Sequence, residues 1–119
     1  MTKEAYSCVC IDDDKLFIEI ISGKIRQLDF LDLIACYNNP MTALVKVDQL
    51  RPDIIFLDVD LPEINGFTFM DALDYKPIIV MMTSHWEQEE HAIKKGVDAF
   101  LTKPLKSAEQ ISDALFKLL

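Results

Sequence analysis

The sequence predicts an α/β fold in which a five-stranded parallel sheet is sandwiched between two layers of helices. Two observations carry this prediction. Five short runs are almost wholly apolar and lack the polar alternation of a strand that faces water on one side. Each run is followed by a segment whose apolar residues recur at helical spacing. Strands that are buried on both faces and joined by helices form a parallel sheet covered on both sides.

The apolar runs give the expected strands in chain order. The run at 7–11 is stopped by three consecutive aspartates, and the run at 54–57 is the most hydrophobic of the five. The expected strands are 7–11, 33–37, 54–57, 78–82 and 99–101.

The helices are expected between and after these strands. Asn39 before Pro40 reads as an N-cap with proline in the first turn, and Ser107 with Gln110 forms a capping box. The fourth helix is polar and should end at Lys95-Gly96. The residues expected to face the core are Phe17, Ile20, Ile21, Ile25 and Leu28 in the first helix, Ala43, Leu44 and Val47 in the second, Phe67, Met70 and Leu73 in the third, and Ile111, Ala114, Leu115 and Leu118 in the last.

Length and composition indicate one globular domain. The chain has 119 residues and is 50% hydrophobic and 27% charged, which is typical of a folded domain rather than a disordered segment. No internal repeat, low-complexity tract or linker occurs. We expect a single domain over residues 1–119, without an effector domain in this chain.

The charge balance excludes several function classes. Acidic residues outnumber basic ones by 20 to 12, and a net charge of −8 disfavours direct binding to nucleic acid. The first residues lack the apolar stretch of a signal peptide, and no apolar run approaches the roughly 20 residues of a membrane span. These features predict a cytoplasmic protein that makes no membrane contact.

The three cysteines are an odd number, form no CxxC motif and have no histidines at ligand spacing, so they do not indicate a disulfide framework or a metal site. Cys8 and Cys10 alternate within a strand and are expected on opposite faces, and Cys36 lies in another apolar run. The prediction is that all three are reduced, buried thiols.

Polar side chains follow the strands where each strand ends. Asp12 and Asp13 follow the first strand, Asp58 the third, Thr83 the fourth and Lys103 the fifth. Ligands of open parallel sheets bind at this carboxyl edge. Carboxylates packed together repel one another, and a hard divalent cation such as Mg²⁺ relieves the repulsion. With a lysine and a hydroxyl added, the set suits a phosphoryl group carried on one carboxylate.

Four motifs, in this order and at these separations, give the chain a family resemblance. They are Ile-Asp-Asp-Asp at 11–14, Phe-Leu-Asp-Val-Asp-Leu-Pro at 56–62 with Gly66, Met-Thr-Ser at 82–84, and Gly-Val-Asp-Ala-Phe-Leu-Thr-Lys-Pro at 96–104. From residue 7 to residue 118 the chain resembles the receiver domain of two-component response regulators. The resemblance implies a flavodoxin-like (βα)5 fold, a three-layer sandwich with strand order 2-1-3-4-5.

The resemblance also implies roles for the acidic residues. Asp58 would accept a phosphoryl group from a histidine kinase. Asp13 would ligate Mg²⁺ directly, Asp12 mostly through water, and Asp60 through its backbone carbonyl. The implied activity is that of a regulatory phosphoacceptor, not of an enzyme with a separate substrate.

The remaining motif residues would carry the signal. Lys103 would pair with the phosphate and Thr83 would bond to it, while Phe100 occupies an aromatic switch position. The Lys103-Pro104 peptide is expected to be cis. The face formed by the fourth helix, fifth strand and fifth helix would change and be read by an effector domain or downstream protein.

The implied partners are a sensor histidine kinase or phosphotransfer protein, and a homodimer is left open. The segment 66–78, with Asp-Tyr-Lys-Pro at 74–77, is similar to receivers that carry LytTR-type DNA-binding domains.

Several alternatives stay open at this point. Asp58-Val-Asp60 resembles the nucleophile motif of haloacid-dehalogenase-like phosphatases, although that family places it on the first strand. A flavodoxin-like nucleotide binder would need a Ser-, Thr- and Gly-rich loop where this chain has three aspartates. An adaptor that is never phosphorylated would usually lack one of the acidic or lysine residues. Individually, the aspartates at 12–14 would also suit a solvated helix start, and Phe100 a core position.

Overall fold

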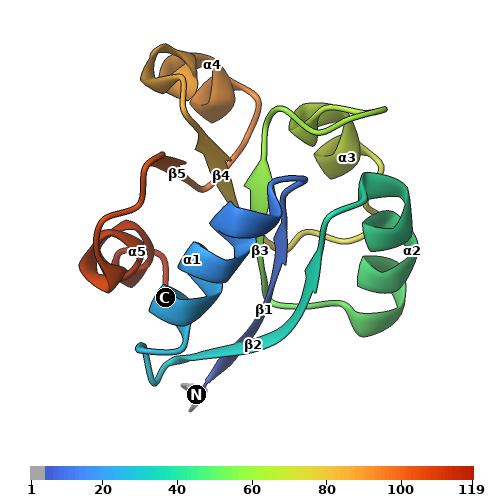
Figure 1. Cartoon of the computed structure of the whole chain (residues 1–119). Helices are drawn as coiled ribbons and strands as arrows, with labels where there is room; N and C mark the ends of the chain where they lie inside the picture. The colour runs from blue at the N-terminus through green and yellow to red at the C-terminus, as the bar shows by residue number, and fades with distance from the viewer. Residues whose placement is uncertain (1–4) are drawn as a thin grey trace.

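The computed structural model describes residues 5–119 and confirms the α/β architecture and the strand order (Figure 1). All neighbouring strands pair in parallel, in the order β2-β1-β3-β4-β5. The strands are β1 (Tyr6–Ile11), β2 (Leu31–Tyr37), β3 (Ile54–Asp58), β4 (Ile78–Thr83) and β5 (Ala99–Thr102).

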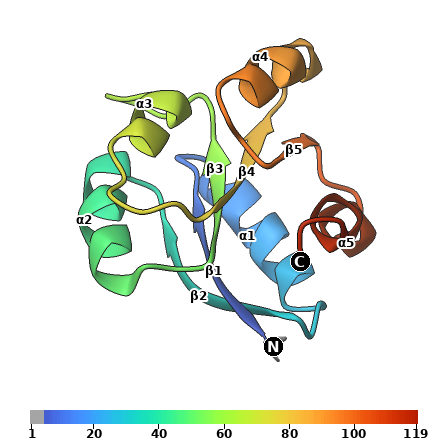
Figure 2. The same cartoon turned by 180° about the vertical axis from the view of Figure 1, so that it is seen from behind.

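Helices cover both faces of the sheet, as Figures 1 and 2 show from opposite sides. One face carries α1 and α5, and the other carries α2, α3 and α4. The bounds are α1 (Lys15–Ile25), α2 (Pro40–Leu50), α3 (Gly66–Asp71), η1 (Trp86–Gln88), α4 (Glu89–Lys94) and α5 (Ala108–Phe116), where η1 is a 3₁₀ turn that leads into α4.

The sheet divides the core into two apolar clusters. The α1–α5 cluster consists of Cys8, Cys10, Phe17, Ile21, Ile25, Leu31, Ile54, Phe56, Val80, Met82, Leu101, Leu105, Ile111 and Leu115. The α2–α4 cluster consists of Val9, Ile11, Ala43, Val47, Ile55, Leu57, Val59, Leu61, Phe69, Ile79, Met81, Ala92 and Val97. Successive residues of β1 and β3 alternate between the two clusters, so both strands are buried on both faces, as the apolar runs predicted.

This alternation corrects the prediction for the cysteines. Cys8 and Cys10 both lie in the α1–α5 cluster and not on opposite faces. Side chains two positions apart on a strand point to the same side, because the pleat repeats every two residues.

Some predicted helix faces were also wrong at their margins. Ile20 is 41% exposed and Leu118 is 36% exposed. The buried face of α1 follows Phe17, Ile21 and Ile25, which are spaced by four, and Ile20 lies beside that stripe. Leu118 lies past the end of α5 at Phe116, where the helix no longer directs it to the core.

Side chains cap the first turns of α1, α2 and α5 and so fix the loops that follow β1, β2 and β5. Asp14 caps α1 and accepts bonds from the N–H groups of Leu16 and Phe17 at 3.0 and 3.3 Å. Asn39 caps α2 in the same way, and the N–H of Ser107 donates to Gln110 Oε1 at 3.1 Å in the predicted capping box. Of the three aspartates after β1, the last therefore has a structural role.

Gly66 begins α3 where the helix meets the end of β3. A Cβ atom on Gly66 would lie 2.6 Å from the backbone oxygen of Asp58, closer than van der Waals contact allows. We predict that Gly66→Ala lowers the free energy of unfolding by about 1–3 kcal/mol, because the backbone must shift to admit the methyl group. Urea unfolding followed by circular dichroism measures this.

Gly23 provides the matched control. It lies inside α1, and a Cβ atom there would have no neighbour within 4 Å. Gly23→Ala should raise the free energy of unfolding by about 0.5–1 kcal/mol through helix propensity. Equal effects of the two substitutions would contradict the close approach at Gly66.

Candidate functional site

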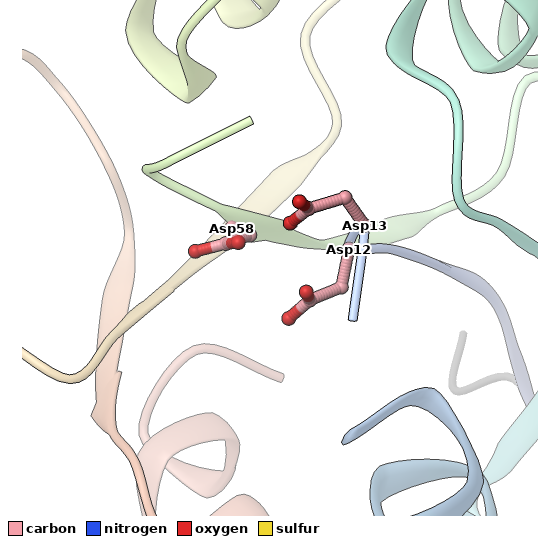
Figure 3. A group of neighbouring side chains, drawn as sticks. All are labelled: Asp12, Asp13 and Asp58. Atoms are coloured by element: carbon pink, nitrogen blue, oxygen red, sulfur yellow. The ribbon is translucent and has the colours of Figure 1, made fainter. Parts of the chain in front are cut away.

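Three carboxylates gather where β1 and β3 end. Asp12 and Asp13 directly follow β1, Asp58 is the last residue of β3, and the two strands are paired neighbours. One oxygen from each carboxylate lies within 4.8 Å of the others, and Figure 3 shows the three groups close together at the strand ends. Asp12 is 0% exposed and Asp58 is 4% exposed, whereas Asp13 faces solvent. Of the four acidic residues predicted for the site, Asp12, Asp13 and Asp58 thus form one carboxylate cluster.

Lys103 provides the positive charge of the site. Its Nζ lies 2.6 Å from Asp12 Oδ2 and 3.7 Å from Asp58 Oδ2. The peptide between Lys103 and Pro104 is cis. The residue follows β5, and its N–H donates to the carbonyl oxygen of Thr83 in β4 at 2.8 Å. This backbone bond holds the residue where its long side chain reaches from the edge of the sheet to its centre.

Burial dominates the electrostatics of Asp58. Desolvation, with the negative charge of Asp12 next, raises the pKa of Asp58 from 3.8 to about 6. The Lys103 ammonium and the Asp60 N–H, which donates to Asp58 Oδ1 at 3.2 Å, act in the opposite direction but do not cancel the rise. The carboxylate is therefore held in a site that disfavours its charged form.

The donor set fits a magnesium ion. Three carboxylates face one ammonium, which leaves two negative charges uncompensated in a largely buried site. All three candidate ligands are oxygen donors, and Asp13 keeps the site open to solvent. Hard, partly hydrated cations such as Mg²⁺ bind in this kind of setting.

The other predicted site residues lie around this cluster. Thr83 is fully buried at the end of β4, and its Oγ1 accepts a bond from the His85 N–H at 3.1 Å. Phe100 on β5 is half-buried against the α2–α4 cluster, so it is not a fully enclosed core residue. Asp60 is exposed, and the part of it that contacts Asp58 is its N–H.

One residue near the site was not foreseen from the sequence. The Phe17 ring lies under the Lys103 ammonium, with 4.3 Å between Nζ and the ring centroid. A cation over an aromatic face is stabilised by the ring quadrupole. The helical spacing of the sequence correctly places Phe17 on the core face of the first helix, but spacing alone does not indicate a partner 86 positions away.

The fold and the acidic edge define a small α/β domain whose chemistry lies at the carboxyl ends of its strands. A family model for the response regulator receiver domain matches residues 8–115, and the chain belongs to this family.

Curated relatives are longer than this chain. A response regulatory protein of Vibrio cholerae is 27% identical over 115 residues, which cover 95% of this chain and 48% of that protein. The transcriptional regulatory protein BtsR of Salmonella typhi is 30% identical over 98 residues, covering 81% of this chain and 41% of BtsR. The chain thus spans less than half the length of these two relatives.

Solved structures share the fold. The chemotaxis response regulator CheY4 of Vibrio cholerae has a TM-score of 0.78 at 23% identity, covering 97% of this chain and 99% of that one. A chain of the CheX-CheY-BeF3-Mg complex of Borrelia burgdorferi matches with a TM-score of 0.83 at 17% identity, covering 95% of this chain and 88% of the matched one. Among residues 5–119, no helix is long and apolar enough to cross a membrane.

The raised pKa of Asp58 predicts a pH dependence of stability without metal. Between about pH 4 and pH 6 the folded protein binds more protons at Asp58 than the unfolded chain does, so the free energy of unfolding falls as the pH rises through this window. Asp58→Asn should remove the fall and be more stable than the wild type at pH 7, by on the order of 2 kcal/mol. Chemical unfolding of the wild type and Asp58→Asn at several pH values, with a chelator present, measures the pH dependence and the difference in stability.

Asp60→Asn is the matched control for this prediction. It removes an exposed carboxylate two residues away, so its effect should stay within about 0.5 kcal/mol. If Asp58→Asn left the pH dependence unchanged, the electrostatic account of Asp58 would be wrong.

Proposed function

We propose that this domain is a phosphoacceptor switch, in which Asp58 takes a phosphoryl group from a histidine kinase or phosphotransfer protein. The observation that carries the proposal is the meeting of three strand-end carboxylates with the Lys103 ammonium. Membership of the receiver family supports it.

The transfer is a substitution at phosphorus. An Asp58 carboxylate oxygen forms a bond to phosphorus as the bond from phosphorus to the donor's imidazole nitrogen breaks, and the electron pair stays on that nitrogen. The product is an acyl phosphate on Asp58. Lys103, 3.7 Å from Asp58 Oδ2, is placed to pair with the added negative charge, and the Asp60 N–H holds the other carboxylate oxygen.

Asp12, Asp13, Asp58 and the backbone carbonyl of Asp60 are the groups that would hold Mg²⁺. When bound there, the ion would neutralise charge on the carboxylate and on the incoming phosphoryl group. The Borrelia complex combines CheY, a protein of the same fold, with BeF3 and Mg, and this combination supports the same assignment here.

Phosphorylation would be passed on through Thr83 and Phe100. The acyl phosphate would add charge and acceptor oxygens next to the end of β4, where the Thr83 hydroxyl would donate a hydrogen bond to them. Movement of Thr83 would make room for Phe100, which is only half-buried. A bias of about 1–3 kcal/mol between two arrangements of the α4–β5–α5 face is enough for useful coupling.

An effector domain or downstream protein would read this face, in the cytoplasm. Relatives such as BtsR are named transcriptional regulatory proteins and are more than twice as long as the matched region. They support an effector beyond the receiver, and the LytTR type stays a prediction.

The proposal predicts one stoichiometric labelling event. With acetyl phosphate and Mg²⁺, intact-mass analysis of the wild type should show a single phosphoryl adduct, and Asp58→Asn should show none. Equal labelling of both proteins would remove Asp58 from its role.

Asp60→Asn separates this proposal from the phosphatase alternative. A haloacid-dehalogenase-like enzyme would need the Asp60 side chain as general acid and would turn over a phosphomonoester. A receiver uses only the backbone of this residue, so Asp60→Asn should still be labelled. Multiple turnovers of p-nitrophenyl phosphate that are lost in Asp60→Asn would favour the phosphatase.

Trp86 offers an optical test of coupling. It is 73% exposed and lies three residues after Thr83, in the turn that leads into α4. Its fluorescence should change with Mg²⁺ and with beryllofluoride in the wild type, and the beryllofluoride response should be absent in Asp58→Asn. A flat titration in the wild type would argue against coupling between the site and this turn.

A further inference from the structure

Two of the three cysteines face each other across the β1–β2 pair. The register of these strands shifts between Cys8 and Val9: Cys8 lies opposite Leu33, but Cys10 lies opposite Cys36. Without the shift, Cys10 would lie opposite Ala35. The irregularity in β2 therefore places two sulfur atoms side by side, both on the face covered by α1.

Cys36 differs from the other two cysteines in its access to solvent. Cys8 and Cys10 are fully buried, whereas Cys36 is half-buried. It lines an open pocket of about 380 Å³ between α1 and the start of α2, together with Lys15, Glu19 and Asn39. The expectation of three buried thiols therefore holds for two of them, and a small reagent has a route to the third.

Polar donors surround the Cys36 sulfur. Ser22, a buried serine of α1, places its Oγ 3.3 Å from Cys36 Sγ, within hydrogen-bond distance, and Cys10 lies opposite Cys36 in the strand register. When the Ser22 hydroxyl donates to this sulfur, it stabilises the thiolate, which is the nucleophilic form.

We propose that Cys36 is a peroxide-reactive thiol and that Cys10 is its resolving partner, so that oxidation closes a Cys10–Cys36 disulfide. The pair is not part of the acidic site, and the proposal does not depend on phosphorylation of Asp58.

The oxidation proceeds in two balanced steps. The Cys36 sulfur attacks one oxygen of hydrogen peroxide, the O–O bond breaks, and Cys36 becomes a sulfenic acid while the second oxygen leaves as water. The Cys10 sulfur then forms a bond to Cys36 Sγ, the S–OH bond breaks, and hydroxide leaves as water with the proton of Cys10. Adjacent strands are about 4.8 Å apart, within the Cα separation that a disulfide spans.

The electrostatics of Cys36 agree with this assignment. The hydrogen bond from Cys10, with those from Ser22 and the charge of Arg26 added, lowers the pKa of Cys36 to about 6 in spite of its partial burial. The charged groups that face it are Arg26, Lys15 and Glu19, of α1 and its C-terminal cap, while its neighbours at the start of α2 are uncharged. Burial raises the pKa of Cys8 to about 12, and the neighbouring Cys36 together with burial raises the pKa of Cys10 well above its usual value. Cys36 is therefore the thiol that reacts first with peroxide, and Cys10 reacts only with the sulfenic acid formed beside it.

The test is peroxide treatment of the folded chain at pH 7, followed by alkylation of remaining thiols under denaturing conditions and peptide mass mapping. We expect the wild type to lose two alkylatable thiols, with a linked peptide that contains Cys10 and Cys36, and to recover them with dithiothreitol. Cys10→Ser should stop at the sulfenic acid, which dimedone traps on Cys36. Cys36→Ser should keep both remaining thiols over the same time.

Two further variants separate reactivity from structure. Cys8→Ala removes the buried cysteine outside the pair and should oxidise at the wild-type rate.

Ser22→Ala removes a hydrogen bond to Cys36. The pH profile for alkylation of Cys36 by iodoacetamide should therefore shift upward, and the alkylation rate at pH 6 should fall several-fold. Oxidation of Cys36→Ser at the wild-type rate, a disulfide that involves Cys8, or a dimer on a non-reducing gel in place of the internal link would each overturn the assignment.

Discussion

The structure depends on the contact between Lys103 and two buried carboxylates. Asp12 and Asp58 lie at the ends of adjacent strands, where parallel pairing forces their side chains to the same edge. Like charges buried this close destabilise a fold unless a cation stands between them. Lys103 reaches them from beyond β5 because its backbone is bonded to Thr83 and its ammonium rests on the Phe17 ring. The single positive charge of Lys103 thus offsets part of the repulsion between the carboxylates at this edge of the sheet. It does not neutralise all three carboxylates.

The uncompensated negative charge of the carboxylate cluster connects the stability of the domain to its proposed function. A carboxylate whose charge is destabilising in the folded protein is stabilised strongly by a bound cation or by covalent modification. The electrostatic repulsion that is removed then contributes to the free energy of binding. Asp58 combines such a position with a raised pKa and one oxygen held by the Asp60 N–H. Under the proposed function, occupation of the site would change the electrostatic forces on Lys103 and on the end of β4. A switch needs this property: two arrangements that differ by only a few kcal/mol.

The sequence correctly predicted the site residues that directly follow the ends of strands. The parallel sheet and the meeting of Asp12, Asp13, Asp58 and Lys103 at its edge followed from five apolar runs and the residues that end them, and the strand order followed from the family resemblance. Contacts between distant segments and the exact pairing of strands could not be predicted from the sequence. The contact between Phe17 and Lys103 joins two distant segments, and the irregular register that pairs Cys10 with Cys36 leaves no mark in hydrophobic periodicity. Ile20 was misplaced because it borders a helical stripe whose width depends on packing.

The helix α1 links the two chemistries of the domain. Its first turn is capped by Asp14, directly after the acidic pair, and its Phe17 ring supports Lys103. Ser22, five residues further on, contacts Cys36, whose partner Cys10 lies two residues before Asp12 on the same face of β1. Helix α1 therefore contacts both the ammonium of the acidic site, through Phe17, and the sulfur pair, through Ser22.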